Sequence, residues 1–134
     1  MESWQLWREM ARESVEAAQL AEAGGCPRSA ASRYYYSAYQ SVTAMLLYQR
    51  VPTPEGRQAW SHDKTPDLIN EQLGLLLQIR DKRNDLTRRL ERLYKMRIVA
   101  DYMADKSVRA DNLKIVRRDA SYILKVAERV LPER

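Results

Sequence analysis

One short stretch of the chain, RIVADY, combines a cation, an anion and a phenol within two helical turns. Its arginine, Arg97, lies on a stripe of otherwise apolar residues at helical spacing: Leu86, Leu90, Leu93, Arg97, Ala100 and Ala104. Because an unpaired buried charge is very costly, Arg97 must be paired or must face a cleft. Asp101 follows one turn later and can face it, with Tyr102 next. The pattern fits either a structural ion pair or an arginine that binds a phosphate and is oriented by Asp101.

His62 is the only histidine of the chain and lies in the segment WSHDKTPD. Imidazole titrates near neutral pH, so His62 is a candidate general acid or base. A lone histidine in a loop is also common without any function, and that alternative stays open. The single cysteine, Cys26, forms no metal site with His62 at any standard ligand spacing. Phosphate-binding loops, dinucleotide glycine motifs and serine elbows are absent as well. The sequence therefore predicts no metal and no cofactor.

Four of the eight tyrosines crowd into the segment SRYYYSAYQ, in a chain without phenylalanine. Tyr35 lies on an apolar helical stripe, so core packing explains it. Tyr34, Tyr36 and Tyr39 point in other directions around the same helix. Tyrosine is favoured where a large side chain is buried with a polar tip, so we expect a second buried surface. That surface is either another helix of the chain or another subunit, and stacking on a nucleic-acid base is a further alternative.

Basic residues are concentrated in the second half of the chain, between residues 80 and 97. Arg88, Arg92 and Lys95 fall on one line at helical spacing. Asp85 and Glu91 are interleaved with them, so part of this pattern is ordinary pairing on a solvated helix face. The net charge of +5 permits contact with nucleic-acid phosphates without requiring it. The row of Arg88, Arg92 and Lys95 is therefore either a solvated helix face or a surface that binds nucleic acid.

The elements that must position these residues are predicted to be helices, because apolar residues recur at helical spacing along most of the chain. A first helix carries a stripe of Trp7, Met10, Ser14, Ala17 and Ala21, and Gly24 and Gly25 stop it. The remaining helices are expected to run from Pro27 to about Gln49, from about Thr65 to Ile79, through the stripe that contains Arg97, and through a stripe of Leu113, Val116, Ala120, Ile123, Ala127 and Val130. The segment RDKRND is expected to form a break that separates the third helix from the fourth.

Four to five amphipathic helices with short connections predict an all-α protein, an antiparallel bundle that forms one domain over residues 1–134. Hydrophobic residues make up 45% of the chain, enough for a core. The longest apolar runs, TAMLLY and LGLLLQI, are too short to span a membrane. The first residues do not resemble a signal peptide, and one cysteine excludes an internal disulfide. We therefore expect a soluble cytoplasmic protein without membrane contact.

Five segments in this order resemble the HEPN domains, small all-α proteins of prokaryotes: AxxLAEAG, SAASRYYYSAYQSVTAMLLY, SHDK, LxRLYKMRIVADYM and VRRDASYILKVAERV. The chain looks most similar to the branch with an Arg/Asn-x-x-Tyr-Tyr element in the second helix and Arg-x-x-Ala-Asp-Tyr in the fourth. The resemblance implies a helical bundle that pairs as a homodimer. Many such proteins are toxins of toxin–antitoxin or phage-defence modules, and active ones are metal-independent endoribonucleases. A minimal nucleotidyltransferase is often their antitoxin, and in one group it adds AMP to a tyrosine.

The chain departs from this family where the chemistry is expected. Active members carry an arginine followed after four to six residues by a histidine, and no histidine follows Arg97. Asp101 and Tyr102 stand near the positions of that histidine and of the modified tyrosine. The resemblance thus implies Arg97, Asp101 and His62 as catalytic candidates and Tyr102 as a possible modification site. The candidates for binding RNA or a nucleotide are Arg33, Tyr36, Arg88, Arg92 and Lys95.

Two functions remain open from the sequence. The first is a toxin-like HEPN protein that binds RNA or acts on it as a metal-independent endoribonuclease, with a nucleotidyltransferase antitoxin as its partner. The second is a non-catalytic HEPN module that binds a nucleotide or a protein, in which Arg97 and Asp101 form a structural pair. The missing histidine favours the second function, and the tyrosine-rich helix together with RIVADY favours the family itself.

Overall fold

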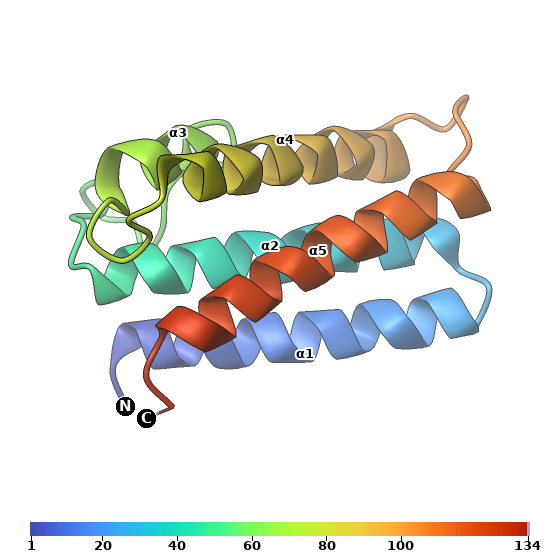
Figure 1. The fold of residues 1–134 in the computed structure, drawn as a ribbon. Helices are drawn as coiled ribbons and strands as arrows, with labels where there is room; N and C mark the ends of the chain where they lie inside the picture. Colours follow the sequence, from blue (N-terminus) through green and yellow to red (C-terminus); the bar gives the residue numbers. More distant parts are fainter. Residues whose placement is uncertain (134) are drawn as a thin grey trace.

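The computed structural model describes residues 1–133 and contains five helices (Figure 1). Their bounds are Ser3–Ala23 for α1, Pro27–Tyr48 for α2, Thr65–Gln72 for α3, Arg80–Tyr102 for α4 and Ala110–Val130 for α5. No strand occurs among the described residues. The predicted all-α class is therefore confirmed.

The four long helices run alternately in opposite directions, so that both termini lie at the same end of the bundle (Figure 1). Helix α2 is the central element and contacts each of the other four helices. This position explains why its predicted apolar stripe is fully buried. It also explains the tyrosines, because a helix with neighbours on several sides can bury side chains in several directions.

Two of the tyrosines that point away from the predicted stripe are buried against other parts of the same chain. Tyr34 donates a hydrogen bond of 2.6 Å to Glu22 of α1. Tyr39 donates one of 2.5 Å to the backbone carbonyl of Trp60, in the loop before α3. The expected second buried surface is thus supplied within the chain for these two residues, and each phenol retains a partner for its polar tip.

The turn between α1 and α2 follows the sequence prediction. Gly25 adopts a positive φ of 76°, which side chains rarely tolerate, and the backbone N–H of Cys26 bonds to the carbonyl of Ala21. Pro27 occupies the first turn of α2, where its missing N–H leaves no bond unmade.

The buried face of α1 differs from the predicted stripe. Its buried residues are Trp4, Arg8, Ala11, Ser14 and Ala18, whereas Met10 is exposed. A search for apolar residues at helical spacing does not find this stripe, because an arginine occupies one of its positions. Arg8 is buried because its guanidinium lies 5.0 Å from the ring of Trp4 and donates hydrogen bonds to the carbonyls of Pro132 and Glu133. It thereby holds the end of the chain against α1.

The predicted boundary between the third and fourth helices is wrong. Helix α3 ends at Gln72, and a turn that buries Leu73 and Leu77 takes the place of its expected second half. Leu75 and Ile79, which lie in the range predicted for the third helix, are outside any helix and exposed. The segment RDKRND begins α4 instead of breaking it. Charged residues support a helix start when an acid such as Asp81 lies near the positive end of the helix dipole.

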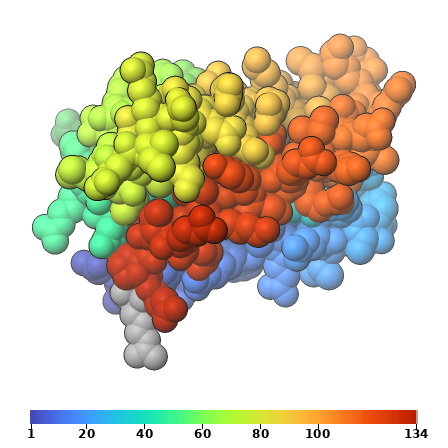
Figure 2. Space-filling model, in the orientation of Figure 1, coloured from blue at the N-terminus to red at the C-terminus, as the bar shows by residue number. Residues whose placement is uncertain are grey.

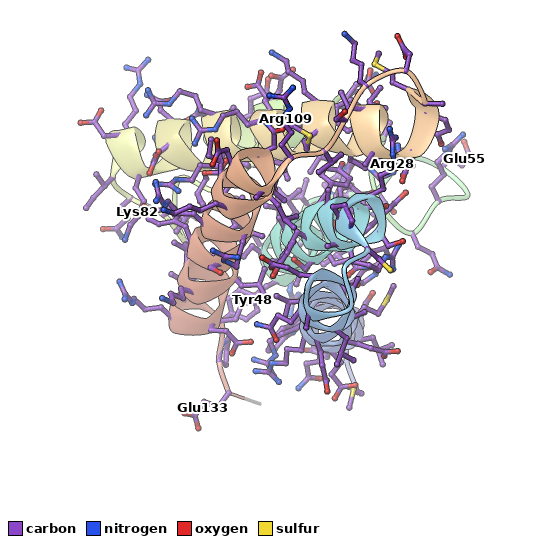
Figure 3. All side chains as sticks on the ribbon, turned by 90° about the vertical axis from the view of Figure 1, so that its right-hand side faces the viewer. Arg28, Tyr48, Glu55, Lys82, Arg109 and Glu133 are labelled. Atoms are coloured by element: carbon purple, nitrogen blue, oxygen red, sulfur yellow. The ribbon has the colours of Figure 1, made fainter. Side chains whose placement is uncertain are left out.

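Helix α4 ends at Tyr102, so Ala104 lies in the following turn and is exposed rather than part of the stripe. Arg28, near the start of α2, lies beside this end of α4 (Figure 3). Its guanidinium donates hydrogen bonds to the carbonyl groups of Val99, Ala100, Met103 and Lys106. A helix end leaves such carbonyls without intrahelical partners, and a cation also opposes the negative end of the dipole. Arg28 therefore caps α4 from another helix.

The helices within residues 1–133 include none that is long and apolar enough to cross a membrane.

Candidate functional site

The central helix α2 has one opening to solvent. From Ala30 to Leu46 every residue is buried except Arg33 and Tyr36, which are partly exposed. These two residues lie about one helical turn apart, so they share one side of the helix. Helix α4 brings Arg97 to the same place. The opening therefore coincides with three of the residues that the sequence selected as site candidates.

Arg97 is held by groups from two helices. Its Nε lies 2.9 Å from Oδ2 of Asp101, which confirms the predicted ion pair across one helical turn. Its terminal nitrogen donates hydrogen bonds of 2.7 Å to the hydroxyl of Tyr36 and of 3.4 Å to that of Tyr102. The guanidinium lies 5.3 Å and 5.2 Å from the centres of these two rings, within range of cation–π attraction. Only 12% of the Arg97 side chain is exposed, so the guanidinium is enclosed by these groups.

A second arginine contacts the same tyrosine. The guanidinium of Arg33 lies 4.7 Å from the centre of the Tyr36 ring. Asp101 also accepts a hydrogen bond of 3.1 Å from the hydroxyl of Ser32, which orients its carboxylate. Two guanidinium groups therefore flank one ring, while one carboxylate offsets only one of their charges. The remaining positive charge suits an anion such as a phosphate.

An open cleft adjoins these groups between α2 and α4. Its volume is about 470 Å³, and it is lined by Arg28, Ser29, Ser32, Arg33, Ala100 and Asp101. Tyr102, the last residue of α4, follows the lining residue Asp101 in the chain, is 68% exposed and contacts Arg97. The arrangement offers charge, hydroxyl groups and an exposed aromatic ring to a ligand. Such groups bind phosphates and stack on unpaired bases.

The loop before α3 inserts His62 among aromatic rings of α2 and α4. Its Nδ1 lies 2.6 Å from the hydroxyl of Tyr35, and its ring stacks with Tyr94 at 6.0 Å between centroids. The imidazole also lies 4.4 Å from the ring of Tyr39 and edge-on to Tyr36 at 5.7 Å. His62 therefore contacts the same tyrosine that holds Arg97. The sequence could not place this loop, because the contact depends on how three separate segments pack.

Burial lowers the pKa of His62 below its ordinary value of 6.5, and the positive charge of Arg97 lowers it further, against a smaller opposing effect of Asp63. The imidazole is therefore mostly neutral near pH 7 and able to accept a proton. Burial also raises the pKa of Tyr35, so its hydroxyl stays protonated. The pair is an imidazole and a phenol, both uncharged.

The other predicted binding residues lie on a different face of α4. Arg92 donates hydrogen bonds of 2.9 Å and 2.8 Å to both carboxylate oxygens of Asp119 on α5, and Arg88 lies 3.5 Å from Asp85. Lys95 lines a groove toward α5. The structure therefore splits the predicted set: Arg33 and Tyr36 join Arg97, whereas Arg88, Arg92 and Lys95 do not.

Sequence reasoning missed two residues that shape this region. Asp119 is buried in the apolar stripe of α5, where Arg89 and Arg92 bind it, and Arg28 caps α4 beside the cleft. A carboxylate among apolar residues at helical spacing was a visible signal of the first, of the same kind as Arg97. The role of Arg28 had no local signal, because its acceptors belong to another helix.

Metal ligands are not clustered in the described part of the chain. No group of three histidine, cysteine or acidic side chains is positioned there to hold an ion, and Cys26 is exposed.

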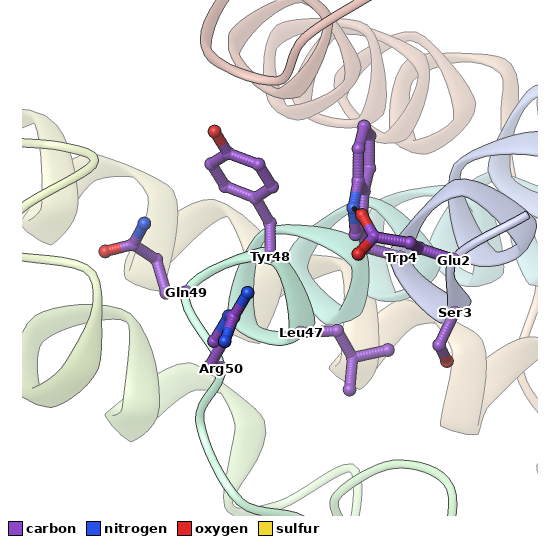
Figure 4. A pocket seen from close by; sticks show the side chains of 7 residues that line it. All are labelled: Glu2, Ser3, Trp4, Leu47, Tyr48, Gln49 and Arg50. Atoms are coloured by element: carbon purple, nitrogen blue, oxygen red, sulfur yellow. Dashed lines mark hydrogen bonds between the residues drawn. The ribbon is translucent and has the colours of Figure 1, made fainter. Parts of the chain in front are cut away.

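Another hollow lies where the start of α1 meets the end of α2 (Figure 4). It measures about 510 Å³ and includes Trp4 and Tyr48, whose rings meet edge to face at 5.2 Å. Trp4 donates a hydrogen bond of 2.7 Å to Glu2, which closes one wall. None of the residues predicted for function lines it, so we place the candidate site at the α2–α4 cleft.

The sequence model of the HEPN domain matches residues 4–133, nearly the whole chain. A comparison with curated proteins finds none that matches.

Proposed function

The chain belongs to the HEPN domain family, and we propose that it binds RNA at the cleft between α2 and α4 and cleaves it without a metal. One observation carries the proposal. Arg33 and Tyr36 form the only opening in the long buried stretch of α2, and Arg97 is fixed there by Tyr36, Tyr102 and Asp101. A guanidinium whose orientation is set before the ligand arrives stabilises phosphate charge at little cost in reorganisation.

The proposed reaction is a transfer of the phosphodiester within the RNA. A base removes the proton of a 2′-hydroxyl, and its oxygen attacks the adjacent phosphorus. The bond from phosphorus to the 5′-oxygen breaks, which leaves a 2′,3′-cyclic phosphate and a 5′-hydroxyl that takes up a proton. Arg97 and Arg33 would stabilise the charge that develops on the phosphate oxygens. His62 is the candidate base because its lowered pKa keeps it neutral, while Asp101 orients Arg97.

The biological role that we propose is that of a toxin in a prokaryotic toxin–antitoxin or defence module. The support is the similarity of the tyrosine-rich helix and of RIVADY to that branch of the family. In this proposal the chain acts as a homodimer and a nucleotidyltransferase is its antitoxin. Tyr102 is a suitable acceptor for AMP because its ring is largely exposed at the end of α4. Transfer of AMP from ATP to its hydroxyl, with release of pyrophosphate, would add a negative charge beside Arg97 and block the cleft.

The test is expression of the chain in a bacterial host, with measurement of growth and of new RNA ends. Arg97→Lys is the central variant, since it retains the charge but loses the planar guanidinium. His62→Gln and Asp101→Asn test the other two roles. Arg88→Ala is the matched control, because Arg88 lies on the other face of α4. We expect growth arrest and cut RNA from the wild type and from the control, and neither from Arg97→Lys.

The proposed cleavage is overturned if the wild type leaves RNA intact and growth unchanged when expressed as a folded protein. It is also overturned if purified Arg97→Lys, folded by circular dichroism, cuts RNA at the wild-type rate. If the earliest cleavage products end in a 3′-phosphate and none carries a 2′,3′-cyclic phosphate, the proposed mechanism is contradicted, although the cleavage activity itself stands.

A non-catalytic nucleotide-binding role is the second candidate, and the ion pair favours it. Arg97 is mostly buried and paired, as a structural arginine would be. In that case Arg97→Ala should lower the free energy of unfolding by about 3–5 kcal/mol, as when one partner of a buried pair is removed. The wild type would then bind a labelled nucleotide or RNA oligonucleotide and would leave the RNA uncut.

A further inference from the structure

A third recess lies between α4 and α5. These two helices are neighbours on the face of the molecule that Figure 2 shows. It measures about 260 Å³. Half of its lining residues are apolar, namely Met96, Val99, Ile115 and Val116, and the polar half consists of Arg92, Lys95, Asn112 and Asp119. Ile115 is 47% exposed and can therefore contact a partner. We call this recess the α4–α5 groove.

Cations border the α4–α5 groove along α4. Arg92 and Lys95 line it, and both side chains are exposed to solvent, with 55% of the Arg92 side chain accessible. Arg88 continues the same line one turn earlier and is exposed too. The single acid of the lining, Asp119, is already neutralised by two arginines. Arg92 is one of those two, and Arg88 is paired with Asp85, so Lys95 is the lining cation that no ion pair within residues 1–133 offsets.

We propose that the α4–α5 groove docks an acidic amphipathic helix of a partner protein. One aliphatic side chain of that helix fills the hollow against Ile115 and Val116, and carboxylates one turn to either side pair with Lys95 and Arg92. Apolar anchors at helical spacing flanked by charge are how a helix binds in a groove. The volume is below the range of about 300–1,000 Å³ that drug-sized ligands occupy, so an anchor side chain fits better than a metabolite.

Two other occupants fit the groove less well. RNA would contact the cations through its phosphates, which leaves the apolar side chains of the groove, Met96, Val99, Ile115 and Val116, without a matching surface. A second copy of the chain, paired about a twofold axis, would bring Lys95 and Arg92 toward the same residues of its partner. Like charges at an interface disfavour that pairing. The combination of an apolar floor and a basic border is complementary to an acidic helix, and this proposal does not depend on RNA cleavage.

The test is binding of two labelled peptides to the purified full chain, measured by fluorescence anisotropy. Both are stapled into helices and share leucines at positions i, i+4 and i+7. One carries glutamates at the flanking positions and the other carries lysines. We expect the acidic peptide to bind at least about tenfold more tightly than the basic one at low salt, with the difference reduced by added salt.

Variants locate the binding to the groove. Lys95→Glu reverses an exposed charge at its border and Ile115→Ala removes its most exposed apolar side chain. Each should weaken the acidic peptide about fivefold or more. The matched controls are Lys125→Glu and Leu20→Ala, which make the same kinds of change at exposed positions outside the groove. Neither control should change the affinity by more than about twofold, since distant surface changes rarely couple.

Three results overturn the proposal. The first is equal affinity for the acidic and basic peptides. The second is that neither peptide binds the groove, while an RNA oligonucleotide binds the chain and its affinity falls in Lys95→Glu but not in Lys125→Glu. The third is a dimer in sedimentation that Ile115→Ala converts to a monomer, which would assign the groove to a second copy of the chain.

Discussion

Arg97 of α4 donates a hydrogen bond of 2.7 Å to the hydroxyl of Tyr36 on α2, and its guanidinium also lies against the ring of that tyrosine. One side chain thus binds the arginine in two ways. Tyr36→Phe separates them, because it retains the ring and deletes the acceptor. We expect the free energy of unfolding to fall by about 1–2 kcal/mol, near the lower range for a hydrogen bond to a charged group. Urea titration followed by circular dichroism measures this change.

The control for that variant is Tyr48→Phe, at the far end of α2, which should change stability by less than about 0.5 kcal/mol. A loss of the same size in both variants would show that the Tyr36 hydroxyl contributes no specific interaction with Arg97.

His62 should make the stability depend on pH. Its pKa in the folded chain lies below 6.5, so between that folded pKa and 6.5 the unfolded chain binds more protons. The contribution of His62 to the free energy of unfolding is therefore complete above about pH 6.5 and decreases as the pH is lowered toward the folded pKa. His62→Gln should flatten this part of the profile. The measurement is urea unfolding at several values between about pH 8 and pH 5.5, above the range in which most carboxylates titrate.

If the wild type and His62→Gln follow parallel profiles over that range, then the buried environment of His62 is not as described. A profile that rises as the pH falls would require an anionic partner for the imidazole instead.

Asp119 should be among the most sensitive positions of the chain. Only 2% of its side chain is exposed, and Arg89 and Arg92 donate hydrogen bonds to it from α4. Asp119→Ala leaves these cations without their partner at the α4–α5 contact, and we expect a loss of about 3–5 kcal/mol. Arg92→Ala should cost about 1 kcal/mol or less, because Arg92 is largely exposed and Arg89 remains. Thermal and urea unfolding of both variants test this order.

The reverse order, with Arg92→Ala the more damaging, would mean that Arg92 contributes chiefly through packing in the groove. The double variant distinguishes the two, since a direct interaction makes the combined loss smaller than the sum of the single losses.

Arg28 should stabilise the end of α4 rather than the whole bundle. Its guanidinium donates to several backbone carbonyls there, and a lysine could reach only some of them. We expect Arg28→Ala to lower the free energy of unfolding by about 1–2 kcal/mol and Arg28→Lys to recover part of it. Amide hydrogen exchange should become faster in the last turn of α4, near Tyr102, while the exchange of α1 stays unchanged.

Uniformly faster exchange throughout the chain would instead assign to Arg28 a global role. In that case the cap is part of the cooperative unit, and the position of Tyr102 does not depend on it separately.

The residues around RIVADY illustrate how far a sequence pattern extends. The pairing of Arg97 with Asp101 was predictable, because residues four apart on one helix are neighbours wherever that helix lies. The contacts of Arg97 with Tyr36 and of His62 with Tyr35 were not. They join segments that are separated by 61 and 27 positions in the chain. The two tyrosines were recognised as unusual, but the groups that bind them were unknown.

Errors in the prediction have a common origin in polar residues that tertiary contacts remove from water. Arg8 and Asp119 belonged to none of the predicted buried stripes, although backbone carbonyls and two arginines respectively make their burial favourable. The charged segment at the start of α4 was expected to break a helix, yet nothing in RDKRND prevents one. Hydrophobic periodicity does not detect such residues, because it assumes that charge means exposure.

The sequence by itself determined the helical class, the turn at Gly24 and Gly25, and the apolar stripes of α2 and α5, since these depend on backbone preferences and on spacing along one helix. Only the tertiary structure decided that Arg33, Tyr36, His62 and Arg97 meet in one place while Arg88 and Lys95 do not. The offset and rotation of one helix against another result from many weak packing contacts at once. No local spacing encodes them, and the candidate site exists only where those contacts bring α2, α4 and the loop before α3 together.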